Sequence, residues 1–174
     1  HSPPVVMGRY DYQDCTPMDE EGCAAFRVRQ CVFLFQSFGL LPAVTAMENV
    51  ALPLGLQNGG VAMDIAGSYL QRVGLADRTG HYPGQLSGCE QQRVAVARAF
   101  ACKPTILFAD EPTGNLDSVT GETINDLLFE LNREAGTTLV IVTHEHSLAS
   151  RCSRQLHLKS GLQFTPVTEM SVKC

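Results

Sequence analysis

The chain has 174 residues, of which 44% are hydrophobic and 18% charged, and its formal net charge is −5. This length suits one domain with a substantial hydrophobic core, and the acidic balance gives no support to a nucleic-acid-binding surface. No apolar run approaches the ~20 residues of a membrane span, and the start lacks a signal-peptide pattern, so we expect a cytosolic protein. Seven cysteines without a Cys-x-x-Cys pair are expected to be reduced thiols.

The first 44 residues contain one clear strand signal. Val5–Met7 is read as the end of a strand, and Asp19–Arg29 as a short helix with acidic residues at its start. The continuous apolar run Cys31–Phe35 then predicts a strand buried on both faces. Gln36 follows this strand and leads into a Gly/Pro loop. Ligands gather at the carboxyl ends of parallel strands, so Gln36 is either a ligand contact or simply the first residue of the loop.

Residues 45–103 are predicted to be largely helical. Thr45 and Glu48 have the spacing of a capping box, and Pro53 and Gly55 interrupt the helical pattern that follows. A second helix is predicted from an apolar face at i, i+4 and i+8, formed by Ile65, Tyr69 and Val73. This region is interpreted as a small helical subdomain inserted between strands.

The stretch Leu86–Arg93 combines a turn with a helix start. Ser87 is placed as the N-cap and Glu90, three residues later, completes a second capping box. Gly88 and Cys89 are small, so the first backbone N–H groups of the helix are open to an anion at the positive end of its dipole. The helix is predicted to run to Ala101. Capping boxes also precede many helices that bind no ligand, so this stretch alone does not identify a site.

The next strand is predicted over Thr105–Ala109, and two carboxylates, Asp110 and Glu111, follow it directly. Asp110 fits a contact to Mg²⁺, which takes oxygen ligands and keeps most of its waters. Glu111 would then be available to orient or deprotonate a water molecule. A turn containing Asn115 leads to Asp117 or Ser118 as the cap of the next helix.

The carboxyl-terminal part repeats the pattern of helix and strand. The helix capped at Asp117 or Ser118 has an amphipathic face and is predicted to end at Gly136; its apolar positions are Ile124, Leu127, Leu128 and Leu131. A third buried strand, Thr138–Val142, leads to His144, whose imidazole could reach a phosphate from the same sheet edge. The segments 156–158 and 162–164 are predicted to form a hairpin.

Five motifs in this order resemble those of the ATP-hydrolysing subunits of ABC transporters. The resemblance covers roughly residues 19 to 164 and is closest to the bacterial branch that includes lipoprotein-releasing and macrolide-exporting systems. The motifs that carry it are Gln36 as the Q-loop, Leu86–Arg93 as the signature, Ile106–Glu111 as Walker B, Asn115–Asp117 as the D-loop and His144 as the H-switch.

The resemblance implies an α/β fold, namely a P-loop NTPase-like ABC ATPase core with a helical subdomain. In its terms, residues 1–44 are core strand and Q-loop, 45–103 the helical subdomain with the signature, 104–165 the core from Walker B to the H-switch, and 166–174 a tail. It also implies two cofactors, ATP and Mg²⁺. The implied partners are a membrane permease and a second ATPase subunit arranged head to tail, and the implied location is the inner face of the plasma membrane.

The resemblance also assigns a role to each matching residue. Gln36 and Asp110 would hold Mg²⁺, with Gln36 also contacting the attacking water, which Glu111 would polarise, while His144 would touch the γ-phosphate. Ser87, Gly88 and Cys89, with Glu90 completing their helix start, would present backbone amides to ATP bound by the other subunit. Asn115 and Asp117 belong to the D-loop, and Asp117 would couple the two sites.

Two features depart from the family pattern. No Gly-x-x-x-x-Gly-Lys-Ser/Thr phosphate loop occurs in the 174 residues. The family places this loop before the Q-loop, so the chain is expected to be a partial ATPase domain that begins too late to include the amino-terminal strands. In the signature, Cys89 stands where the family has its second Gly, and a side chain there obstructs the close approach of a phosphate.

Two other interpretations remain open from the sequence. One is a lobe of a chromosome-maintenance (SMC) or double-strand-break-repair ATPase, although that lobe lacks a helical insert between Q-loop and signature. The other is a non-catalytic remnant that only docks on a permease or a partner ATPase. The missing phosphate loop favours a remnant, whereas Asp110, Glu111 and His144 favour a working ATPase.

Overall fold

The computed structural model describes residues 9–10, 13–14, 30–58, 61–159 and 162–164. They belong to two compact units, His1–Val142 and Thr143–Cys174. The strand end predicted at residues 5–7 and the helix predicted at 19–29 lie outside the described residues. Two short strands precede the core, β1 (Arg9–Tyr10) and β2 (Gln13–Asp14), and they pair antiparallel.

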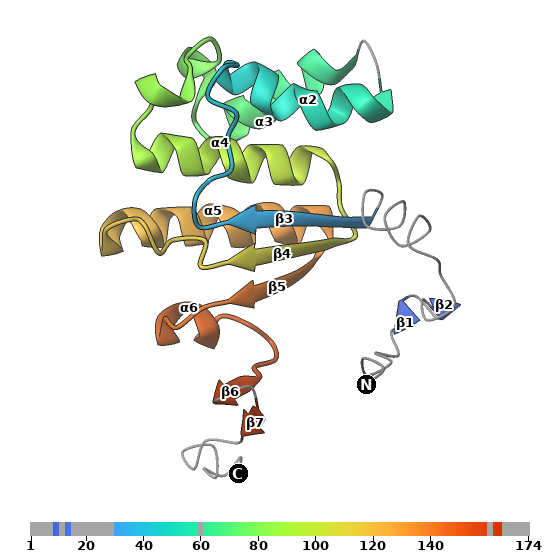
Figure 1. Ribbon diagram of the computed structural model, residues 1–174, viewed down its shortest axis with the longest axis vertical. Helices are drawn as coiled ribbons and strands as arrows, with labels where there is room; N and C mark the ends of the chain where they lie inside the picture. The colour runs from blue at the N-terminus through green and yellow to red at the C-terminus, as the bar shows by residue number, and fades with distance from the viewer. Residues whose placement is uncertain (1–8, 11–12, 15–29, 59–60, 160–161, 165–174) are drawn as a thin grey trace, which may run out of the picture. The chain divides into compact units, whose positions relative to one another are not determined.

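The core of the first unit is a three-stranded parallel sheet in the order β3-β4-β5. These strands are β3 (Cys31–Phe35), β4 (Ile106–Asp110) and β5 (Thr138–Val142), so β3 and β5 have the predicted bounds. Parallel neighbours need crossover connections. Three helices connect β3 to β4, and α5 (Ser118–Ala135) connects β4 to β5 and lies behind the sheet in Figure 1.

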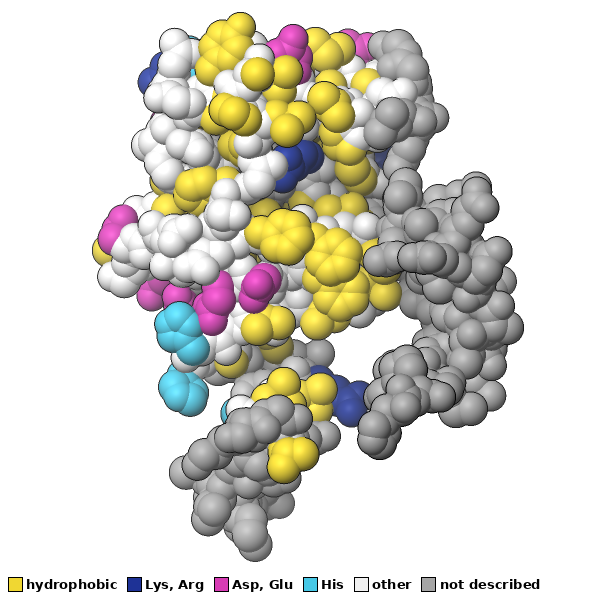
Figure 2. All heavy atoms as spheres, viewed as in Figure 1, with side chains coloured by type: hydrophobic (Ala, Val, Ile, Leu, Met, Phe, Trp, Pro, Cys, Tyr) yellow, Lys and Arg dark blue, Asp and Glu magenta, His cyan; other side chains and the backbone are white. Residues whose placement is uncertain are grey.

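The prediction that these strands are buried on both faces is wrong for the described structure. Burial alternates along each strand, with Leu34, Leu107 and Ala109 buried on the face toward the helices. On the other face Phe33 and Phe35 are 47% and 49% exposed. Phe33 stacks on Phe35 and on Phe108, with ring centroids 6.0 and 5.1 Å apart. Figure 2 shows hydrophobic side chains exposed over this part of the sheet. Apolar runs therefore marked the strands correctly but overstated their burial.

The helical region consists of three packed helices above the sheet in Figure 1. They are α2 (Ala46–Asn58), α3 (Ala62–Arg72) and α4 (Gly88–Ala101), with the short 3₁₀ helices η2 (Ala76–Arg78) and η3 (Pro83–Gln85) before α4. The predicted capping box at Thr45 is confirmed, since the Glu48 carboxylate accepts hydrogen bonds from the Thr45 amide and hydroxyl. However, α2 runs through Pro53, which was expected to interrupt it.

The face of α3 in the core differs slightly from the predicted one. Its buried residues are Ala62, Ala66 and Leu70, while Ile65 and Tyr69 flank them and are half-buried. The predicted face of α5 is confirmed, because Ile124, Leu128 and Leu131 are buried. That helix ends at Gly136 in the left-handed conformation, with φ 66°, as the C-cap signal predicted.

The second unit contains α6 (His146–Ser150), which was not predicted, and a hairpin. Strands β6 (His157–Lys159) and β7 (Leu162–Phe164) pair antiparallel, which confirms the predicted hairpin. Among the described residues, no helix of either unit is long and apolar enough to cross a membrane.

Candidate functional site

Three of the predicted site residues, Gln36, Asp110 and Glu111, lie at the carboxyl ends of the parallel strands. Phe35 pairs with Asp110, and Asp110 pairs with Val142, so the three strands end level with one another. Gln36 directly follows β3, Asp110 is the last residue of β4, and Glu111 follows it. Gln36 and Asp110 are exposed and Glu111 is half-buried.

Glu111 has a backbone conformation that side chains disfavour. Its φ is 45°, in the left-handed region, where an L-residue is strained by about 1–2 kcal/mol. Two backbone hydrogen bonds hold it there: the Glu111 amide donates to the Val142 carbonyl at 2.9 Å, and the Gly114 amide donates to the Glu111 carbonyl at 3.0 Å. Such conformations persist where the surroundings over-determine them, and they cluster at functional sites.

Gln36 and Asn115 are joined by a reciprocal pair of hydrogen bonds across 79 residues of sequence. Gln36 Nε2 donates to Asn115 Oδ1 at 3.2 Å, and Asn115 Nδ2 donates to the Gln36 carbonyl at 2.9 Å. The turn between Glu111 and Asn115 passes close to this pair. A Cβ built on Gly114 would lie 2.7 Å from Gln36 Nε2 and 3.4 Å from the Glu111 Cβ. The structure therefore brings Gln36, Glu111 and Asn115 into one cluster.

We expect Gly114→Ala to displace the Gln36 side chain. The added methyl would overlap Gln36 Nε2, and because this atom ends a flexible side chain, the chain can turn away at the cost of its bond to Asn115. The free energy of unfolding should fall by no more than about 1 kcal/mol, while the Gln36 side-chain amide signals in a ¹H–¹⁵N NMR spectrum should shift. Gly84→Ala is the control, since a Cβ there meets nothing within 4 Å. Unmoved Gln36 signals in Gly114→Ala would contradict the described packing.

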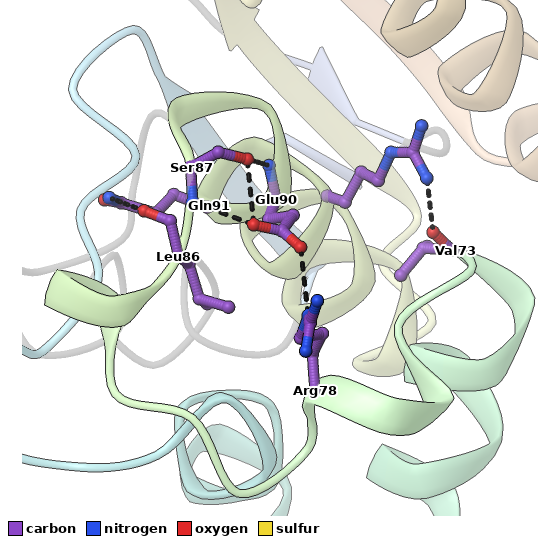
Figure 3. Close-up of polar contacts among 7 residues, drawn as sticks. Val73, Arg78, Leu86, Ser87, Glu90 and Gln91 are labelled. Atoms are coloured by element: carbon purple, nitrogen blue, oxygen red, sulfur yellow. Dashed lines mark hydrogen bonds and ion pairs between the residues drawn. The ribbon is translucent and has the colours of Figure 1, made fainter.

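The start of α4 has the capping box that the sequence predicted. Ser87 Oγ accepts from the Glu90 amide at 3.3 Å, and the Glu90 carboxylate accepts from the Ser87 amide and hydroxyl at 2.8 and 2.9 Å. Figure 3 shows these bonds and the ion pair that ties Glu90 to Arg78, with Nε and Oε1 3.3 Å apart. The Ser87 hydrogen bonds, and secondarily Arg78, lower the pKa of Glu90.

This pKa shift predicts an acid sensitivity of the helix start. A lowered pKa in the folded chain means that Glu90 stabilises the fold above its unfolded-state pKa of about 4.3, and that this contribution is lost as pH falls through the folded-state value. In urea unfolding at a series of pH values from about 6 to 3, Glu90→Gln should therefore lose less stability than the unsubstituted chain. Ser87→Ala, which keeps the backbone donor, should lie between the two. Equal pH dependence in all three proteins would rule out this role of Glu90.

The start of α4 at Gly88 lies next to the loop after Gln36 and the loop after Asn115. A Cβ built on Gly88 would lie 3.8 Å from Phe38 Cζ and 3.8 Å from Leu116 Cδ2, so the residue after Ser87 faces both the loop after Gln36 and the loop after Asn115. Ser87 and Gly88 are exposed, whereas the adjacent Cys89 is half-buried and packs against the core. Cys89, Cys102 and Cys152 are thiols, as the sequence predicted.

Asp117 and His144 lie in different surroundings. Asp117 is the N-cap of α5: its carboxylate accepts from the Thr120 amide at 3.1 Å, and hydrogen bonding with Thr120 lowers the pKa of Asp117. His144 belongs to the second unit, where it precedes α6 and has an exposed side chain.

The structure adds two residues that sequence patterns did not single out. Arg98 on α4 donates to the Gly39 carbonyl at 2.7 Å and to the Phe38 carbonyl at 3.0 Å, and burial lowers the pKa of its guanidinium. Phe38 and Gly39 are consecutive left-handed residues, with φ 60° and 57°. Asn49, which is 1% exposed, accepts from the Leu41 amide at 2.8 Å and donates to nearby carbonyls. Side chains of α4 and α2 thus both hydrogen-bond to the loop after Gln36.

The residue types of this cluster fit a Mg²⁺–phosphate ligand. Mg²⁺ prefers oxygen donors and commonly takes only one or two from the protein. The Asp110 carboxylate could supply one. The Gln36 amide oxygen could supply another, since the amide nitrogen is the atom that bonds to Asn115. The start of α4, where Ser87 and Gly88 are exposed, suits an anion.

The chain is similar to known proteins of one family. The family model described as "ABC transporter" matches residues 7–114. The ABC transporter ATP-binding protein YbbA of Escherichia coli K12 is 55% identical over 146 residues, which are 83% of this chain and 64% of YbbA. The lipoprotein-releasing system ATP-binding protein LolD of Myxococcus xanthus is 51% identical over 146 residues, 83% of this chain and 65% of LolD.

A solved structure shares the fold. The ATP-binding cassette MJ0796, in a dimeric post-hydrolysis state bound to ADP and Pi, superposes with a TM-score of 0.75 at 41% identity, over 87% of this chain and 68% of that one. The match confirms the predicted α/β core with a helical subdomain. The chain spans slightly less than two thirds of the length of YbbA and LolD.

Proposed function

The chain belongs to the ABC transporter family, and from this premise we propose that it is an ATP-binding and ATP-hydrolysing subunit that powers transport through a membrane permease. The observation that carries the proposal is the cluster of Gln36, Glu111 and Asn115 beside the start of α4. The loop after β3 and the turn after β4, which are far apart in the sequence, meet there, and the start of α4 lies beside both.

The proposed roles follow from the position and chemistry of each side chain. Asp110 and Gln36 hold Mg²⁺, which neutralises phosphate charge when bound. Glu111 orients the attacking water and takes its proton as the water oxygen bonds to the γ-phosphorus and the bond to the β-phosphate oxygen breaks. His144 contacts the γ-phosphate. The Asn115 amide keeps Gln36 in place through their reciprocal hydrogen bonds.

The start of α4 is proposed to act on a nucleotide held by another subunit. Gly88 and Cys89 present backbone amides to the γ-phosphate, and preorganised donors of this kind stabilise developing charge without reorganising. The Ser87 amide, which the resemblance also assigned to the phosphate, donates to the Glu90 carboxylate here and instead holds the helix start in shape. Glu90 maintains the helix start from which those amides project. Asp117, at the end of the Asn115 turn, couples the two sites.

The proposed partners are a second ATPase subunit and a membrane permease. The dimeric state of the MJ0796 cassette supports the first partner. The name of the macrolide export ATP-binding/permease protein MacB of Syntrophobacter fumaroxidans, 44% identical over 158 residues (88% of this chain and 22% of MacB), supports the second. We place the subunit on the inner face of the plasma membrane, as an exporter or extractor like LolD and MacB.

The helical region between Gln36 and the signature favours a transporter subunit over a DNA-repair-type lobe. Helices α2 and α3 occupy this interval and pack on α4 through buried residues such as Val50, Leu54 and Leu70. A lobe without a helical insert would have no counterpart of these helices.

Nucleotide binding by the 174-residue chain tests the proposal. We expect weak binding of a fluorescent ATP analogue that requires Mg²⁺ and is lost in Asp110→Asn, because the phosphate loop that normally supplies most phosphate contacts is not in this sequence. Phosphate release should stay at background. Asp126→Asn, on the exposed side of α5, is the control that should bind like the unsubstituted chain. Binding that is indifferent to Mg²⁺ and Asp110, or turnover that depends on Glu111, would refute this account of the chain.

A further inference from the structure

Gln92 is a completely buried amide on α4, and it bonds to the turn that carries Glu111. The side chain of Gln92 is 0% exposed, and its Nε2 donates to the Pro112 carbonyl. Pro112 directly follows Glu111 and is itself buried. The bond therefore links α4 to the peptide next to the strained Glu111 backbone.

Gln92 lies on the same face of α4 as Gly88. The two residues are four apart, so they lie one above the other on one face of the helix. Gly88 faces Leu116 and Gln92 reaches Pro112, so this face of α4 lies along residues 112–116. Helix α4, whose N-cap is Ser87, thus contacts both ends of the turn formed by residues 112–116.

Burying the Gln92 amide costs free energy of folding, which indicates that the amide does more than fill space in the core. Its Oε1 is buried and no group among the described residues donates to it. An unsatisfied buried polar atom is destabilising, whereas an apolar side chain of similar size, such as Leu, would pack there without that penalty. The Gln92 amide, unlike a Leu side chain, donates a hydrogen bond to the Pro112 carbonyl.

We propose that Gln92 is a positioning residue for Glu111. Its Nε2–H fixes the Pro112 peptide against α4, and with the Val142 and Gly114 hydrogen bonds it keeps Glu111 in the left-handed conformation. Gln92 thereby connects the backbone that binds nucleotide at the start of α4 to the carboxylate that orients the water. Nucleotide binding at the start of α4 and the orientation of water by Glu111 rest on the proposed function. The positioning of Glu111 by Gln92 does not.

NMR of the 174-residue chain without nucleotide tests the positioning. In Gln92→Leu, loss of the donor should shift the ¹³C signal of the Pro112 carbonyl, and the Gly114 and Glu111 amides should exchange with solvent about fivefold faster, the factor for one net hydrogen bond of about 1 kcal/mol. The three-bond coupling between the amide and α protons of Glu111, which reports φ, should change. Core amides such as Leu107 should be protected as in the unsubstituted chain, after correction for global stability.

Gln91→Leu is the matched control, since Gln91 is the adjacent residue of the same type and its Nε2 donates to the Leu86 carbonyl at 3.0 Å. It should shift the Leu86 carbonyl and leave Pro112 and Gly114 unchanged. The proposal is overturned if Gln92→Leu leaves the Pro112 and Gly114 signals unchanged, or if Gln91→Leu moves them equally. Should Gln92→Leu not fold, the coupling across the hydrogen bond from Gln92 Nε2 to the Pro112 carbonyl can be sought in the unsubstituted chain, where its absence overturns the proposal. These signals need no ATP, so they fail or succeed independently of nucleotide binding.

Discussion

Replacing Glu111 with Gln is expected to lower kcat for ATP hydrolysis by about 100-fold or more, the contribution typical of a positioned general base. The protein for this measurement is a completed domain, in which an amino-terminal segment with a phosphate loop from a family member precedes this chain. KM for MgATP should change little, because Gln has the size of Glu and the proposed Mg²⁺ ligands, Asp110 and Gln36, are retained.

The structural basis of this prediction is the position of Glu111. It directly follows β4, its backbone is held at φ 45°, and the Gly114 turn places it beside Gln36. Glu122→Gln, at an exposed position of α5, is the control and should keep the full rate. A Glu111→Gln variant with more than a tenth of the original kcat would exclude Glu111 as the general base.

Replacing Cys89 with Gly is expected to raise kcat of the completed domain about fivefold, the factor for one additional hydrogen bond of about 1 kcal/mol. Cys89 is the second residue of α4, at the position where the family has a Gly that lets a phosphate approach the backbone amides closely. The gain should have a cost in stability. Gly in a helix is less favourable by roughly 0.5–1 kcal/mol, and the half-buried Cys89 side chain packs against the core.

Cys89→Ala separates the thiol from the bulk of the side chain. It removes the sulfur but keeps Cβ, so its kcat should lie between those of the Cys and Gly proteins, with stability close to the original. An unchanged or lower rate in Cys89→Gly would show that Cys89 does not impede the signature.

Local signals in the sequence predicted the elements of this fold well. Hydrophobic runs gave the bounds of β3 and β5, and capping boxes gave the starts of α2 and α4. These features depend on neighbours within a few residues. The same reasoning failed at Pro53, where packing of α2 against α3 and α4 outweighs the lost backbone hydrogen bond.

The contacts that assemble the candidate site could not be predicted from local patterns. The Gln36–Asn115 pair spans 79 residues, the Arg98–Phe38 bond 60 and the Gln92–Pro112 bond 20. Polar residues inside a helix carry no signal of what they bond to across the fold. The one-sided burial of the strands was missed for a similar reason, because a continuous apolar run such as Cys31–Phe35 does not indicate which face the helices cover.

ATP-dependent dimerisation tests most directly whether the start of α4 completes a nucleotide site on another subunit. The completed domain with Glu111→Gln, which should bind ATP without consuming it, is to be sized by light scattering with and without MgATP. We expect a dimer only with MgATP, and a monomer under both conditions when Gly88→Asp is added, because a carboxylate there repels the γ-phosphate. A dimer that forms without ATP, or one that persists with Gly88→Asp, would contradict this role of the start of α4.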